Sequence, residues 1–169
     1  MSDESLAFSL ADFADLDISS VEEVRFELIP QGVYVFEVTE ADVEENLNKD
    51  LHNRFVSGVA CKIIEVKSVL QPGVDKDSLV GKTITDRQYM TPPWPELAEA
   101  GGKPLEEQKK KFADSVGRLK AFLVDIGVDV SQGKVVDRVN GLVGHTFTAK
   151  ITHEADREDK TLLRAKLKA

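Results

Sequence analysis

Cations and aromatic rings are the side chains in this sequence with the clearest capacity for chemistry. They recur in stretches that alternate like β-strands, and together they are what sequence-tolerant binding of single-stranded nucleic acid requires: cations follow the phosphates, and each base stacked on a ring contributes about 1–3 kcal/mol. The candidate binding residues are Tyr34, Arg54, Lys62, Lys82, Arg87, Tyr89, Trp94, Lys150, Arg164 and Lys166, and Lys168 continues the same pattern.

Each of these residues also has an ordinary explanation. Lys and Arg are common on solvated strand faces, and Tyr34 fits a core position equally well. The clustering of the cations on four predicted strands nevertheless favours the binding interpretation.

Motifs of catalysis and metal binding are missing from the sequence. It contains no Gly-rich phosphate loop, no HExxH, no nucleophile elbow and no paired cysteines. His145 and His153 are eight residues apart on one predicted strand, roughly 26 Å when extended, which is too far to share an ion. Cys61 fits a small core residue. We therefore expect a non-catalytic protein without a cofactor or a metal.

The length of 169 residues predicts one domain with a real core. No apolar run approaches the roughly 20 residues that a bilayer span needs, and the first residues do not resemble a signal peptide. The expected location is the cytoplasm, that of the host cell if a phage encodes the protein, without contact to a membrane.

Charge is unevenly distributed along the chain. The net charge is −8, and residues 1–50 hold 14 Asp and Glu against Arg25 and Lys49, a net of −12 that leaves +4 for the remainder. This asymmetry predicts an acidic arm attached to a body that is mildly basic over residues 51–169. The mobile arm is expected over residues 1–30 and the binding domain over residues 31–169. Apolar residues within the arm give a partner protein something to bury: Leu6, Phe8, Phe13 and Leu16.

One long helix organises the domain. The spacing of Phe112, Val116, Leu119, Leu123 and Ile126 places them on one stripe of a helix over 105–126. Pro104 is suited to open this helix and Gly127 to close it.

Five strands are predicted around the helix, over residues 32–44, 55–66, 82–90, 145–153 and 161–168. On the third, Thr83, Thr85, Arg87 and Tyr89 form an outward row, and the fifth is expected to bury Leu163, Ala165 and Leu167. The prolines of 91–95 exclude a regular element there, and a short helical turn is expected within 135–142. Five strands with a helix between the third and fourth is the order of a five-stranded OB-fold barrel, in a mainly β fold; a small open α+β sheet is the alternative.

Four stretches of the sequence carry a resemblance to a known family. They read GVYVFEVTEADVE at 32–44, VGKTI at 80–84, RLKAFLVDIG at 118–127 and LVGHTFTAKI at 142–151. Their order resembles a family of bacteriophage single-stranded DNA-binding proteins over about residues 31–168. The resemblance implies an OB-fold and a role in coating single strands during phage DNA replication, recombination or repair. Two features depart from the family: the acidic segment lies at the N-terminal rather than the C-terminal side, and the Pro-rich loop 91–104 is longer.

Two functions of different classes follow. The first is a non-catalytic protein that coats and protects single-stranded DNA, with replication or recombination proteins as partners of the arm. The second is a protein-interaction module or phage inhibitor that acts through the acidic arm. Self-association, and the choice between DNA and RNA, stay open.

Overall fold

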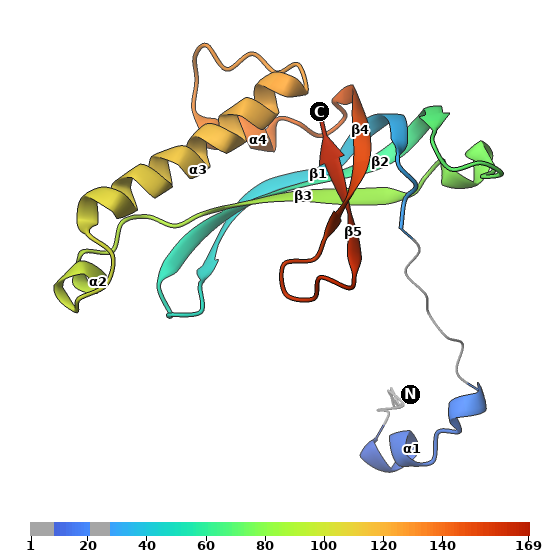
Figure 1. Ribbon diagram of the computed structural model, residues 1–169, viewed down its shortest axis with the longest axis horizontal. Helices are drawn as coiled ribbons and strands as arrows, with labels where there is room; N and C mark the ends of the chain where they lie inside the picture. The colour runs from blue at the N-terminus through green and yellow to red at the C-terminus, as the bar shows by residue number, and fades with distance from the viewer. Residues whose placement is uncertain (1–8, 21–27) are drawn as a thin grey trace, which may run out of the picture.

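A five-stranded sheet and one long helix make up most of the fold (Figure 1). The computed structural model describes residues 9–20 and 28–169. The strands are β1 (Gly32–Leu47), β2 (Asn53–Val69), β3 (Thr83–Met90), β4 (Thr146–Ala155) and β5 (Leu163–Lys168). The helices are α1 (Leu10–Ala14), α2 (Pro95–Glu99), α3 (Leu105–Asp125) and α4 (Val135–Asn140), with 3-10 turns η1 (Ile18–Ser20) and η2 (Lys76–Leu79). The mainly β class and the long helix between the third and fourth strands are confirmed.

The sheet is antiparallel and open. Its strand order is β3-β2-β1-β4-β5, and every neighbouring pair is antiparallel. β3 and β5 are the two edges; they approach each other, but no ladder of hydrogen bonds joins them in the described part of the chain. The closed five-stranded barrel that the element order suggested is therefore not confirmed.

Burial along the strands follows the predicted alternation almost everywhere. Phe147, Ala149 and Ile151 of β4 are buried, while Thr83, Thr85, Arg87 and Tyr89 of β3 are exposed. The prediction fails at Leu163, whose side chain is 55% exposed. The β1–β4 ladder ends at Ile151. Leu163 pairs with Ala155 beyond that end, where β4 no longer has β1 as a neighbour.

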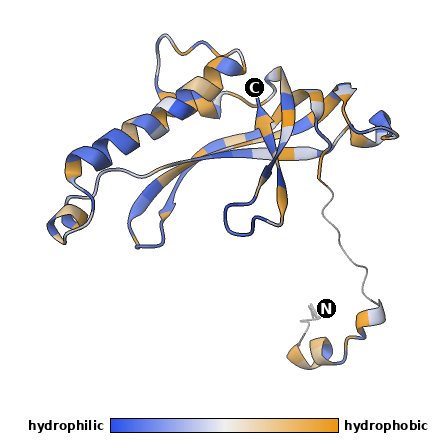
Figure 2. Cartoon of the chain, viewed as in Figure 1, coloured by the Kyte–Doolittle hydropathy of each residue, from blue (hydrophilic) through white to orange (hydrophobic). Residues whose placement is uncertain are grey.

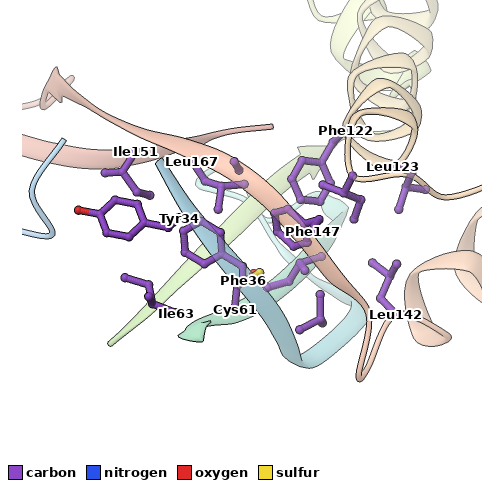
Figure 3. Close-up of a cluster of buried hydrophobic side chains, with 14 of the residues drawn as sticks. Tyr34, Phe36, Cys61, Ile63, Phe122, Leu123, Leu142, Phe147, Ile151 and Leu167 are labelled. Atoms are coloured by element: carbon purple, nitrogen blue, oxygen red, sulfur yellow. The ribbon is translucent and has the colours of Figure 1, made fainter. Parts of the chain in front are cut away.

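Aromatic rings from β1 and β4 form the centre of the core (Figure 3). The ring centroids of Tyr34 and Phe36 lie 6.0 Å apart, and those of Phe36 and Phe147 lie 5.6 Å apart. Phe122 and Leu123 of α3 approach this cluster from one side in Figure 3. The C-terminal part of α3 thus packs against the apolar side of the sheet.

The predicted stripe of α3 is the side that packs on the sheet. Leu119, Leu123 and Ile126 are buried, and Phe112 and Val116 are partly buried against the core. The opposite side of α3 is largely hydrophilic (Figure 2). Gly127 ends the helix with a φ of +89°, a left-handed conformation that glycine adopts without a Cβ penalty.

Boundaries differ from the sequence prediction at two places. β1 and β2 continue to a tight turn at 48–52, because the Asn48 side chain accepts hydrogen bonds from the backbone N–H groups of Asp50 and His52. A short helix, α2, starts at Pro95 inside the stretch expected to be irregular, since proline is tolerated at a first helical position.

The junction with the arm also lies earlier than expected. Ile29 and Pro30 are buried in the body rather than lying in the arm. In the described part of the arm, the side chains of residues 9–19 are exposed. Leu6 and Phe8 lie outside the described residues.

Candidate nucleic-acid interface

Arg54 and Tyr89 form a cation–π pair on the outer face of β2 and β3. The guanidinium carbon of Arg54 lies 4.6 Å from the centroid of the Tyr89 ring. Arg54 Nε donates a hydrogen bond of 2.8 Å to Asn46 Oδ1, which fixes the guanidinium from the β1 side. Tyr89 remains 50% exposed. The pair offers a flat, cationic surface on which a base can stack.

Arg87 extends this surface along β3. It lies opposite Gly58 in the β2–β3 ladder, and its side chain is exposed. Within the described ranges, no carboxylate forms an ion pair with it. We call Arg54, Arg87 and Tyr89 the β2–β3 face. These three predicted binding residues are brought together by the structure.

An acidic row borders the β2–β3 face. Glu40, Asp42 and Glu44 of β1 lie opposite Ala60, Gly58 and Val56 of β2, which in turn lie opposite Thr85, Arg87 and Tyr89 of β3. All three carboxylates are exposed. An anionic ligand on β3 is therefore repelled from β1, which limits the interface to β2, β3 and the side toward β5.

The acidic row changes the charge of the body. Residues 1–28 hold eight Asp and Glu against Arg25, a net of −7, so that residues 29–169 carry −1. Residues 51–169 carry the expected +4, but the folded body also contains the acidic β1, so the body as a whole is not basic. Part of the acid assigned to the arm lies on β1, and binding of a polyanion must depend on the local arrangement of cations.

Tyr34 is not part of the interface. Its side chain is 0% exposed, and its hydroxyl donates a hydrogen bond of 2.6 Å to the carbonyl oxygen of Pro30. The even-numbered residues of β1 face the core in this half of the strand. A base cannot reach this ring.

Trp94 is also occupied within the protein. Its ring stacks on His52 with centroids 4.8 Å apart and planes at 5°. The backbone N–H of Trp94 donates to Gln108 Oε1 of α3 over 2.6 Å, and His52 Nε2 lies 3.2 Å from the carbonyl oxygen of Pro92. Trp94 thus contacts the β1–β2 hairpin tip through its ring and α3 through its backbone, and the half-buried indole is not an open stacking platform.

No protein-family model and no curated protein matches the sequence. The site is therefore described by its own geometry.

The other predicted cations are distributed over the sheet. Three form ion pairs: Lys62 with Glu37 at 3.3 Å, Arg164 with Asp156 at 3.3 Å and Lys166 with Glu154 at 3.2 Å. Exposed pairs of this kind contribute little to stability and open readily for a ligand. Lys82 is half-buried just before β3, and Lys150 faces Lys168 across the β4–β5 ladder.

The two edge strands of the sheet, β3 and β5, lie near each other. Burial raises the pKa of the Asp86 carboxyl of β3, whereas a hydrogen bond from Gln88 and the charge of Lys166 act in the opposite direction. Lys166 therefore lies near the β3 edge of the sheet, although Asp86 belongs to the inner side of β3, opposite Arg87 and Tyr89. The tips of the β1–β2 and β4–β5 hairpins both point to the lower side of the view in Figure 1.

The histidines and the cysteine have structural roles. His145 Nε2 lies 2.6 Å from the carbonyl oxygen of Ile126, and His153 Nε2 lies 2.8 Å from that of Ile29. Burial, with a smaller effect of the Asp86 charge, raises the pKa of the Cys61 thiol to about 12. Over residues 9–20 and 28–169, no three His, Cys, Asp or Glu side chains gather in a set that could hold a metal ion. Nor does any helix in these ranges have the length and apolarity to cross a membrane.

Proposed function

We propose that this chain is a non-catalytic single-stranded DNA-binding protein, and that the strand crosses the β2–β3 face toward β5. The observation that carries the proposal is the exposed Arg54–Tyr89 pair with Arg87 beside it. Bases stack on the pair, and the phosphates lie near Arg87 and Lys166. The acidic row on β1 keeps the phosphate chain to the β3 side.

The topology supports the proposal. The order β3-β2-β1-β4-β5, with a helix between β3 and β4, is the order of an OB-fold barrel opened at its β3–β5 seam. OB-folds are partly open five-stranded barrels that bind oligonucleotides. We therefore propose an OB-type domain. Coating and protection of strands in phage DNA replication, recombination or repair is the role that the sequence resemblance favours.

An equilibrium titration tests this function. A fluorescent oligo-dT is titrated with the protein at several salt concentrations, and anisotropy reports binding. The two cations assigned to the phosphates, Arg87 and Lys166, give an expected slope of log K against log salt of about −1.4, since each phosphate contact on a single strand contributes roughly −0.7. Oligo-U in place of oligo-dT separates DNA from RNA.

Substitutions localise the interface. Arg87→Ala should weaken binding and reduce the salt slope by about 0.7. Lys110→Ala, on the exposed side of α3, is the matched control and should leave both quantities unchanged. If no oligonucleotide binds at low salt, or if the two variants lose affinity equally, the proposed interface is wrong.

A protein-interaction module or phage inhibitor is the second candidate. The observation in its favour is the exposure of apolar side chains in the arm, among them Leu10, Phe13, Leu16 and Ile18. Acidic residues lie between them, as in a segment that binds a basic, apolar surface of another protein. If the protein binds no single-stranded oligonucleotide at any salt concentration, this second candidate is the one that remains.

A further inference from the structure

A shallow hollow of about 270 Å³ opens where β1, β4 and β5 lie side by side, away from the β2–β3 face. Val33 of β1, Thr148 and Lys150 of β4, and Lys168 of β5 contribute to its lining. In the ladders, Val33 lies opposite Lys150, and Lys150 lies opposite Lys168. The hollow therefore combines an apolar floor with a cationic rim.

The two rim lysines form no ion pair with an Asp or Glu side chain in the described part of the chain, although Ala169, the last residue of the chain, also lines the hollow. Both are exposed, and no carboxylate of residues 9–20 or 28–169 forms an ion pair with either, whereas Lys166 on the same strand pairs with Glu154. Like charges directly opposite each other on a sheet are destabilising. An anionic group between them would relieve this repulsion, so the rim favours an acidic occupant.

The arm has the complementary composition. Residues 9–20 contain Asp12, Asp15 and Asp17 and no cation. Phe13 lies among them on α1 and is 63% exposed. A cavity of about 150 Å³ accommodates benzene, so the hollow has room for a phenyl ring. The acids flanking Phe13 would then lie at the lysine rim.

The arm enters the body at the end of β1 that bears the hollow, but on the core side of the sheet, whereas the hollow lies on the outer side. The carbonyl oxygen of Ile29 lies 2.8 Å from His153 Nε2 on β4, and Val33, four residues later, lines the hollow itself. The seven residues 21–27 between the acidic segment and the body could span at most about 25 Å. A short tether gives an effective concentration in the millimolar range, so weak contacts suffice for docking.

We propose that residues 12–17 dock in this hollow of their own molecule, with Phe13 over Val33 and the aspartates at Lys150 and Lys168. The docked segment neutralises the β4–β5 lysines and competes there with other anions. The docking does not depend on whether the β2–β3 face binds DNA.

A spin label on the arm of the full-length protein tests the proposal. Ala14→Cys can be labelled selectively, because the single native thiol, Cys61, is buried with a raised pKa. At low salt, the amide signals of Val33, Thr148 and Lys168 should broaden several-fold more than that of Lys110 on α3. At 1 M salt, where the Debye length falls to about 3 Å, this difference should disappear.

Charge reversal gives the decisive control. Lys150→Glu with Lys168→Glu should abolish the broadening at the hollow, and the further changes Asp15→Lys and Asp17→Lys should restore it. If the double reversal does not melt as the wild type does, Lys150→Ala with Lys168→Ala takes its place and should reduce the broadening.

Three results would overturn the proposal. One is equal broadening at the hollow and on α3, and another is broadening that survives the lysine substitutions. The third comes from mixing spin-labelled protein with isotope-labelled protein that carries no spin label. Broadening of the isotope-labelled copies would show docking between molecules rather than within one.

Discussion

Tyr89 provides the most direct test at the scale of single residues. Its ring is half exposed beneath the Arg54 guanidinium, so Tyr89→Ala should remove a stacking platform with little loss of packing. The expected loss of single-strand affinity is about 1–3 kcal/mol. Anisotropy titration measures the affinity, and a thermal melt close to that of the wild type shows that the fold is kept. A large drop in melting temperature with unchanged affinity would instead assign Tyr89 to packing.

Trp94→Ala should have the opposite effect. Its indole stacks on His52 at the hairpin tip, and this contact is lost in the variant, whereas the backbone hydrogen bond to Gln108 of α3 does not depend on the side chain. Losing a half-buried aromatic contact should lower the melting temperature, while the affinity for oligo-dT changes far less than in Tyr89→Ala. If Trp94→Ala lowers the affinity for oligo-dT as much as Tyr89→Ala does and leaves the melting temperature unchanged, Trp94 belongs to the binding surface.

Asp86 makes stability depend on pH. Its folded-state pKa is raised above the ordinary value of 3.8, chiefly by burial, so the folded protein binds this proton more tightly than the unfolded chain does. The stabilising contribution of the protonated carboxyl is complete below pH 3.8 and is lost as the pH rises through the folded-state pKa.

Asp86→Asn should remove that loss. Urea unfolding at a series of pH values from acid to neutral should show the variant gaining stability relative to the wild type as the pH rises. Lys166→Met is the companion variant; it removes a charge that lowers the Asp86 pKa, so the decline of stability with pH should become larger. If the free energy of unfolding of the wild type and of Asp86→Asn changes with pH in the same way, this account is wrong.

At the scale of elements, α3 has a gradient of burial along its apolar stripe. Leu119 is fully buried and Phe112 only partly, so Leu119→Ala should cost about 2–5 kcal/mol of the free energy of unfolding and Phe112→Ala less. Val124→Ala, at a position 52% exposed, is the control and should change it by about 0.5 kcal/mol or less. Urea denaturation measures all three. A Leu119→Ala curve that matches the wild type would contradict the packing of α3 on the sheet.

Local periodicity explains why the elements were predictable. The alternation in β3 and β4 and the stripe of α3 are patterns within a few residues, and each was confirmed. The closure of the sheet depends instead on whether β3 meets β5, two strands separated by more than 70 residues. The length of the β1–β2 hairpin depends on hydrogen bonds of the Asn48 side chain, which residue periodicity does not report.

The candidate site was predictable in part for the same reason. Strand parity placed Arg87 and Tyr89 in one outward row, and the structure adds Arg54 from the neighbouring strand. Trp94 was misplaced because His52, 42 residues earlier, covers its ring. The acidic row was missed because composition cannot tell a solvated arm from the outward side of β1.

For the whole molecule, the charge of the arm predicts a salt-dependent effect on binding. Deletion of residues 1–24 removes the whole net charge of −7 of residues 1–28. Affinity for oligo-dT should rise at low salt, and the gain should shrink as salt screens the arm. Anisotropy titrations of both proteins across a salt series measure this. Identical affinities at every salt concentration would leave the arm with partner binding or solubility as its role.

The position of β1 at the centre of the sheet has a consequence during synthesis. Val33 pairs with Ser68, which is 35 residues later, and with Lys150, which is 117 residues later. The first ladder can form as soon as β2 leaves the ribosome, but the second must await β4. At roughly 5–20 residues per second, the 86 residues from Val69 to Ala155 take about 4–17 s to make. During that time, the apolar side of the newborn β1–β2 hairpin is uncovered, which makes this interval the point at which a chaperone or a wrong neighbour can bind.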